Sequence, residues 1–62
     1  MKNYAALIYN YYNVLEKVEV RTSWKLANRA GKFFTKNHQG WWYRTTALFP
    51  GELEMYKSMI NA

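Results

Sequence analysis

Basic side chains are the residues of this chain best suited to chemistry, and they are concentrated in the middle of the sequence. Residues 17–44 contain seven Lys and Arg residues and a single acid, Glu19, a net charge of +6, whereas the two basic and three acidic residues elsewhere sum to −1. Aromatic residues are interspersed with them: Trp24, Phe33, Phe34, Trp41, Trp42 and Tyr43. Basic side chains neutralise phosphates and exposed rings stack on unpaired bases, so this composition favours contact with nucleic acid.

Residues that support catalysis or metal binding are scarce. His38 is the single histidine, and no nucleophile or base is paired with it at a recognisable spacing. The absence of cysteine excludes disulfides and thiolate metal sites, and one histidine with four carboxylates does not suggest a metal centre. The three glycines are too far apart for a phosphate-binding loop. We therefore expect no enzyme, no cofactor and no metal site.

The length of 62 residues predicts one small domain. A chain this short buries only about 60% of the surface that its unfolded form exposes. Its aromatic residues, 19% of the chain, exceed what so small a core needs, so we expect exposed rings and self-association or a tight partner. No stretch approaches the roughly 18 apolar residues of a membrane span, and no signal-peptide pattern is visible. These observations predict a cytoplasmic protein with no membrane partner.

The elements that must position the basic residues begin with an expected helix over residues 4–16. Asn3 is a suitable N-cap, and Tyr4, Leu7, Ile8 and Tyr11 recur at the spacing of one helical face. Residues 17–26 then alternate between apolar and polar side chains, which predicts a half-buried strand.

A helical alternative exists for the next part of the chain. Ser23 could cap a helix that ends at Gly31, or the middle helix could cover residues 23–36, and the chain would then be mostly α with three helices. The alternation is longer than this helical pattern, so we favour the strand.

The remaining elements follow from turn and strand signals. Residues 32–36 predict a second strand, residues 37–40 have the composition of a hairpin loop, and residues 41–48 predict a third strand. Pro50 and the acids behind it predict a last helix over residues 51–61. The expected fold is α+β: an N-terminal helix, a three-stranded antiparallel meander and a C-terminal helix, with both helices on one face of the sheet.

This predicted order of elements resembles that of double-stranded RNA-binding domains and of small RNA-cleaving toxins of the HicA type. The resemblance spans the whole chain and consists of the element order alone. The sequence motifs of these families are not visible here, and no residue or activity is carried over from them.

The strand assignments place candidate binding residues on the open face of the sheet. Neighbouring residues of a strand point to opposite faces, so one of Trp41 and Trp42 must point away from the helices. We assign Trp42 to the open face, together with Arg21, Lys25 and Arg44. The full set of residues expected to bind nucleic acid or another partner is Arg21, Lys25, Arg29, Lys32, Lys36, Trp42 and Arg44.

Two functions fit these residues. The first is a small non-enzymatic module that contacts nucleic acid through a basic, aromatic-rich sheet face. The second is a protein-binding inhibitor or regulator that docks on an acidic partner protein, since Tyr, Trp and Arg also dominate protein–protein interfaces.

Overall fold

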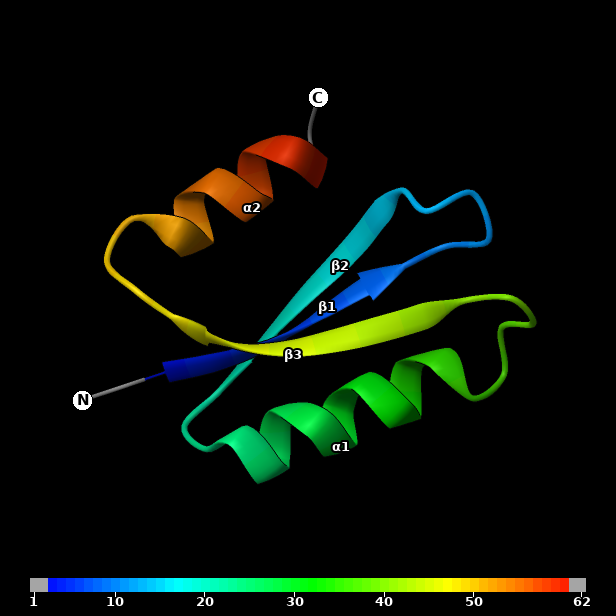
Figure 1. Cartoon of the computed structure of the whole chain (residues 1–62), viewed down its shortest axis with the longest axis horizontal. Helices are drawn as coiled ribbons and strands as arrows, with labels where there is room; N and C mark the ends of the chain where they lie inside the picture. Colours follow the sequence, from blue (N-terminus) through cyan, green and yellow to red (C-terminus); the bar gives the residue numbers. More distant parts are fainter. Residues whose placement is uncertain (1–2, 61–62) are drawn as a thin grey trace.

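The computed structural model describes residues 3–60 and has an α+β fold with a three-stranded antiparallel sheet (Figure 1). Its elements are β1 (Asn3–Tyr9), β2 (Leu15–Arg21), α1 (Trp24–Thr35), β3 (Trp42–Leu48) and α2 (Glu52–Ile60). The strand order is β2-β1-β3, so β1 is the central strand and α1 crosses between the two edge strands. The predicted class is confirmed. The predicted element order and the three-helix alternative are wrong, and the resemblance based on that order is withdrawn.

The two helices cover opposite faces of the sheet, and the sheet lies between them in Figure 1. Ala6 and Ile8 of β1 are fully buried on the side of α1. On the other side, Ala5 and Leu7 form a core cluster with Leu15, against which Tyr56 and Ile60 of α2 pack. The expectation that both helices share one face is therefore wrong. Burial of β1 on both faces gives even this short chain two thin apolar layers.

The N-terminal helix expected over residues 4–16 is wrong, because this region forms the β1–β2 hairpin. The continuous apolar run from residue 5 to residue 8 is typical of a central strand buried on both faces, and it also fits a helical spacing. Asn10 and Asn13 end the strand. The Asn10 Oδ1 accepts the N–H groups of Tyr12 at 2.8 Å and Val14 at 3.1 Å, and Asn13 adopts a left-handed φ of 64°. These are typical turn roles of asparagine.

The strand predicted over residues 17–26 is correct only as far as Arg21. Ser23 starts α1, as in the helical alternative, and the helix continues to Thr35. The predicted second strand over residues 32–36 is therefore wrong. The alternation of apolar and polar residues continues to residue 26, although the strand ends at Arg21 and a helix begins at Trp24. Over these last residues the alternation does not correspond to a strand.

The C-terminal third follows the prediction more closely. Strand β3 and helix α2 confirm the expectations for residues 41–48 and 51–61, of which residue 61 lies outside the described residues. The turn at residues 37–40 contains Gly40 at a φ of 84°, but it joins α1 to β3 and is not a hairpin loop. At the start of α2 the Glu52 carboxylate accepts the N–H of Phe49 at 2.8 Å.

Candidate nucleic-acid interface

Helix α1 presents most of the predicted binding residues. It begins at Ser23, whose Oγ accepts the N–H of Leu26 at 3.2 Å in the usual N-cap arrangement. The small residues Ala27, Ala30 and Gly31 are buried. A helix turns by about 100° per residue, so these three share the side of α1 that faces the sheet. The opposite side of α1 faces solvent.

Four basic residues lie along that solvent side, and we call them the basic stripe: Lys25, Arg29, Lys32 and Lys36. All four are exposed, and Lys36 is the C-cap residue of the helix. Their spacing of four, three and four residues keeps them within one narrow side of the helix. At about 1.5 Å of rise per residue, the stripe is roughly 16 Å long.

No carboxylate among residues 3–60 forms an ion pair with the basic stripe. Helix α1 contains no acid of its own. Glu19 pairs instead with Lys17 at 3.9 Å and Arg21 at 3.2 Å, and Glu16 accepts a hydrogen bond from the Asn10 amide. The positive charge of the stripe is thus left for solvent or for an anionic partner.

The stripe lowers the stability of the helix that carries it. Each pair of like charges three or four residues apart costs about 0.2–0.5 kcal/mol, so the three successive pairs cost roughly 1 kcal/mol. Lys25 lies in the first turn, near the positive end of the helix dipole, and Lys32 lies in the last turn, near its negative end, so the dipole adds little to this cost. A row of phosphates along the stripe would remove this repulsion.

An exposed ring flanks the basic stripe. Phe33 is 67% exposed and contacts Phe34 edge to face, with ring centroids 5.2 Å apart. The Lys17 ammonium of β2 lies 4.5 Å from the centroid of Phe34 and extends the positive surface on this flank. Phe33 and Lys17 were not among the predicted site residues. The signal that identifies Phe33 is its spacing of four residues from Arg29, which becomes visible once residues 24–35 are assigned to a helix.

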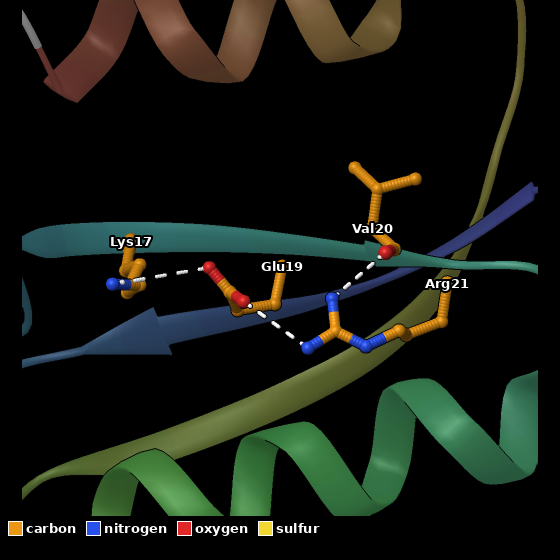
Figure 2. A network of polar contacts seen from close by, with 4 residues as sticks. All are labelled: Lys17, Glu19, Val20 and Arg21. Carbon is orange, nitrogen blue, oxygen red and sulfur yellow. Dashed lines mark hydrogen bonds and ion pairs between the residues drawn. The ribbon is translucent and has the colours of Figure 1, made fainter.

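Arg21 lies apart from the basic stripe. Figure 2 shows Arg21 and Glu19 on the α1 side of β2, while Val20 points toward α2. The Arg21 guanidinium donates to the Glu19 carboxylate at 3.2 Å and to the Val20 carbonyl at 2.9 Å. Its assignment to the open face with Trp42 is therefore wrong, and so is that of Lys25, which belongs to α1. The Arg21 guanidinium is thus partly compensated by Glu19 of its own strand.

Trp42 and Arg44 share the face of β3 that α1 does not cover, but this is the face of the sheet on which α2 packs and not a face free of helices. They pair with Tyr9 and Leu7 of β1, whose side chains lie on the α2 side of the sheet. The Trp42 ring stacks on Tyr9 with centroids 4.3 Å apart, and its indole N–H donates to Asn13 at 2.8 Å. The structure thus separates the predicted binding residues into the stripe on one side of the molecule and this pair on the other.

The described residues contain no enclosed site. No pocket opens on the surface of residues 3–60, and no three His, Asp or Glu side chains among them gather as metal ligands. His38 is exposed and stacks on Trp41, with ring centroids 3.9 Å apart. Neither described helix is long and apolar enough to cross a membrane. The features available for recognition on the described residues are therefore charge and exposed rings.

Comparison with family models, with curated proteins and with solved structures finds no match to this chain.

Proposed function

We propose that this protein binds the phosphate backbone of nucleic acid through the basic stripe of α1. The observation that carries the proposal is the alignment of four exposed cations on one side of a helix that contains no acid. B-DNA carries one phosphate charge per about 1.7 Å of helix axis when both strands are counted, so a length of duplex equal to the stripe, roughly 16 Å, offers more phosphates than the four cations of the stripe. Contacts of this kind depend little on base sequence.

The tight packing of α1 supports the proposal. Tyr43 of β3 packs on Gly31, where a Cβ would overlap its ring, and the Thr45 hydroxyl donates to the Asn28 amide oxygen at 3.2 Å. A helix fixed in this way presents its cations at constant spacing. Less conformational entropy is lost on binding when the charges are already in place.

Phe33, and not the predicted binding residue Trp42, is the ring that stacks on an unpaired base in this proposal. Trp42 already stacks on Tyr9 and lies on the far side of the sheet from the stripe. Phe33 is adjacent to the stripe, so an unpaired base from a strand bound there can reach its ring.

A protein-binding role is the second candidate, and the outer side of α2 favours it. Phe49, Met55 and Met59 are all exposed, and the two methionines are four residues apart on one side of the helix. Methionine is common at adaptable protein-binding surfaces. Under this alternative, nucleic-acid affinity would be weak and would not respond to changes in the stripe.

A titration with labelled oligonucleotides tests the proposal. Neutralising all four stripe residues (K25Q/R29Q/K32Q/K36Q) should weaken binding to duplex and single strand by about three orders of magnitude at 0.1 M salt, because four phosphate contacts are lost. K57Q on α2 removes one exposed charge from the other helix and is the control for loss of charge outside the stripe, with affinity expected to change little. Equal affinity of the quadruple variant and the wild type would refute the proposal.

A further inference from the structure

The two edges of the sheet differ in how well they are protected against pairing with another strand. Within residues 3–60 no segment pairs with the outer side of β2 or β3, so each edge exposes unpaired backbone groups. Four of the seven residues of β2 are charged: Glu16, Lys17, Glu19 and Arg21. Its register with β1 also shifts between Ile8 and Tyr9, so Glu16 bulges out of the ladder. Charges and bulges both discourage edge-to-edge pairing.

Strand β3 has neither form of protection. Its register with β1 is regular over all seven residues, and Arg44 is its single charged residue. Trp, Tyr and Thr make up four of its seven residues, and these residues favour extended backbone. The β3 edge is therefore regular in its pairing, free of proline and rich in strand-forming residues.

We propose that the β3 edge pairs antiparallel with β3 of a second copy, which makes a six-stranded sheet across a two-fold axis. The sequence of β3 complements itself in this orientation. Thr45 is the middle residue of the strand, and pairing centred on it brings all seven residues opposite a partner. Trp42 then lies opposite Leu48 of the second copy, and Arg44 opposite Thr46 of the second copy.

Charge and ladder length favour the register centred on Thr45 over the registers centred on Arg44 and on Thr46. A pairing centred on Arg44 sets two guanidinium groups directly opposite each other, which is destabilising. A pairing centred on Thr46 joins only five residues of each strand instead of seven. The register centred on Thr45 keeps the longest ladder and offsets the two Arg44 side chains diagonally.

Helix α1 has room beside its copy in this arrangement. It packs on β1 and β3, and the two-fold axis stands perpendicular to the sheet, so both copies of α1 lie on the same face. With strands about 4.8 Å apart, the two helix axes would be separated by roughly 10 Å, close to the 8–10 Å of packed helices. The flank of α1 that meets its copy carries Asn28 and, one turn before it, Trp24, which is 53% exposed in the single chain.

The dimer would also affect the proposed binding of nucleic acid, and this consequence alone rests on the proposed function. Two basic stripes on one face double the number of cations available to a single nucleic acid. The contact between β3 strands needs no nucleic acid, so it is tested in its absence.

Sedimentation equilibrium of the chain alone tests the dimer. T46K places a lysine opposite Arg44 of the second copy, and the symmetry of the dimer creates this repulsive pair twice. Cross-strand charge pairs typically contribute roughly 0.2–1 kcal/mol each, so we expect the dimer dissociation constant to rise about 2- to 30-fold. R44E/T46K sets opposite charges across the same interface and should restore or tighten the dimer. T22K is the control: it adds the same charge at an exposed residue that follows β2, and it should leave the dimer dissociation constant unchanged.

Amide hydrogen exchange at low and high protein concentration locates the interface. The proposal predicts added protection in β3 at high concentration and none in β2. A chain that stays monomeric at its highest soluble concentration, or a dimer that T46K does not weaken, or added protection in β2, would overturn it. None of these results bears on whether the stripe of a single chain binds nucleic acid.

Discussion

The two helices pack on opposite faces of one sheet, and they differ in packing and in charge. Helix α1 buries Ala27, Ala30 and Gly31, whereas none of the described residues of α2 is fully buried. Helix α1 has basic residues and no acid, whereas α2 begins with Glu52 and Glu54. The helix that is more deeply packed therefore also has the uncompensated charge.

The contrast in packing follows from side-chain size. Small residues let α1 approach the sheet closely, and the long basic side chains of the stripe are directed outward. Helix α2 has larger residues at its contacts, Tyr56 and Ile60, which remain partly exposed against the core. Helix α2 therefore covers the apolar side chains of β1 and β2, but none of its own described residues is buried in the contact.

The largest single-residue effect should come from the exposed ring beside the basic stripe. F33A should weaken binding to a single-stranded oligonucleotide by about 1–3 kcal/mol and binding to duplex little, because stacking needs an unpaired base. M59A removes a comparably exposed apolar side chain from α2 and should change neither affinity. Fluorescence anisotropy measures both affinities. Equal losses of affinity for F33A and M59A would contradict the assignment of binding to α1 and not to α2.

A smaller effect is expected where α1 meets β3. G31A introduces a Cβ that overlaps the ring of Tyr43, and overpacking of this kind costs about 1–3 kcal/mol. Alanine is the better helix former by about 1 kcal/mol, which offsets part of the loss. Urea unfolding should show a net destabilisation of roughly 1 kcal/mol. A stabilised variant would mean that α1 is not held as closely as described.

The smallest effect concerns the start of α1. S23A removes the side chain that accepts the N–H of Leu26, and loss of an N-cap costs typically about 1 kcal/mol or less in an exposed position. The midpoint of thermal unfolding should fall by a few degrees, since roughly 4–8 °C correspond to 1 kcal/mol in domains of this size. An unchanged midpoint would show that packing alone sets where the helix begins.

The sequence predicted β3 and α2 because each has a local signal of its own. Residues 41–48 are aromatic and β-branched, and Pro50 with its following acids starts a helix. The first hairpin has no such clear signal, since the run of residues 5–8 fits both a helix and a central strand. Whether that run is buried on both faces depends on elements far along the chain.

The candidate binding residues could be listed from the sequence, but not their arrangement. Net charge identified Lys25, Arg29, Lys32 and Lys36 whatever structure they adopt. Their alignment depends on assigning residues 24–35 to a helix, and the alternation over residues 17–26 favoured a strand instead. Strand periodicity places Arg29 and Lys32 on opposite faces, while helix periodicity places them on one side.

The dependence of affinity on salt tests the central claim most directly. For wild-type protein titrated against duplex DNA, at concentrations where the chain is monomeric, four stripe contacts predict that the logarithm of affinity falls with the logarithm of salt at a slope of about −3.6. R29Q should flatten the slope by about 0.9, and K57Q should leave it unchanged. A slope near zero, or one that R29Q and K57Q alter equally, would contradict the assignment of phosphate binding to the basic stripe of α1.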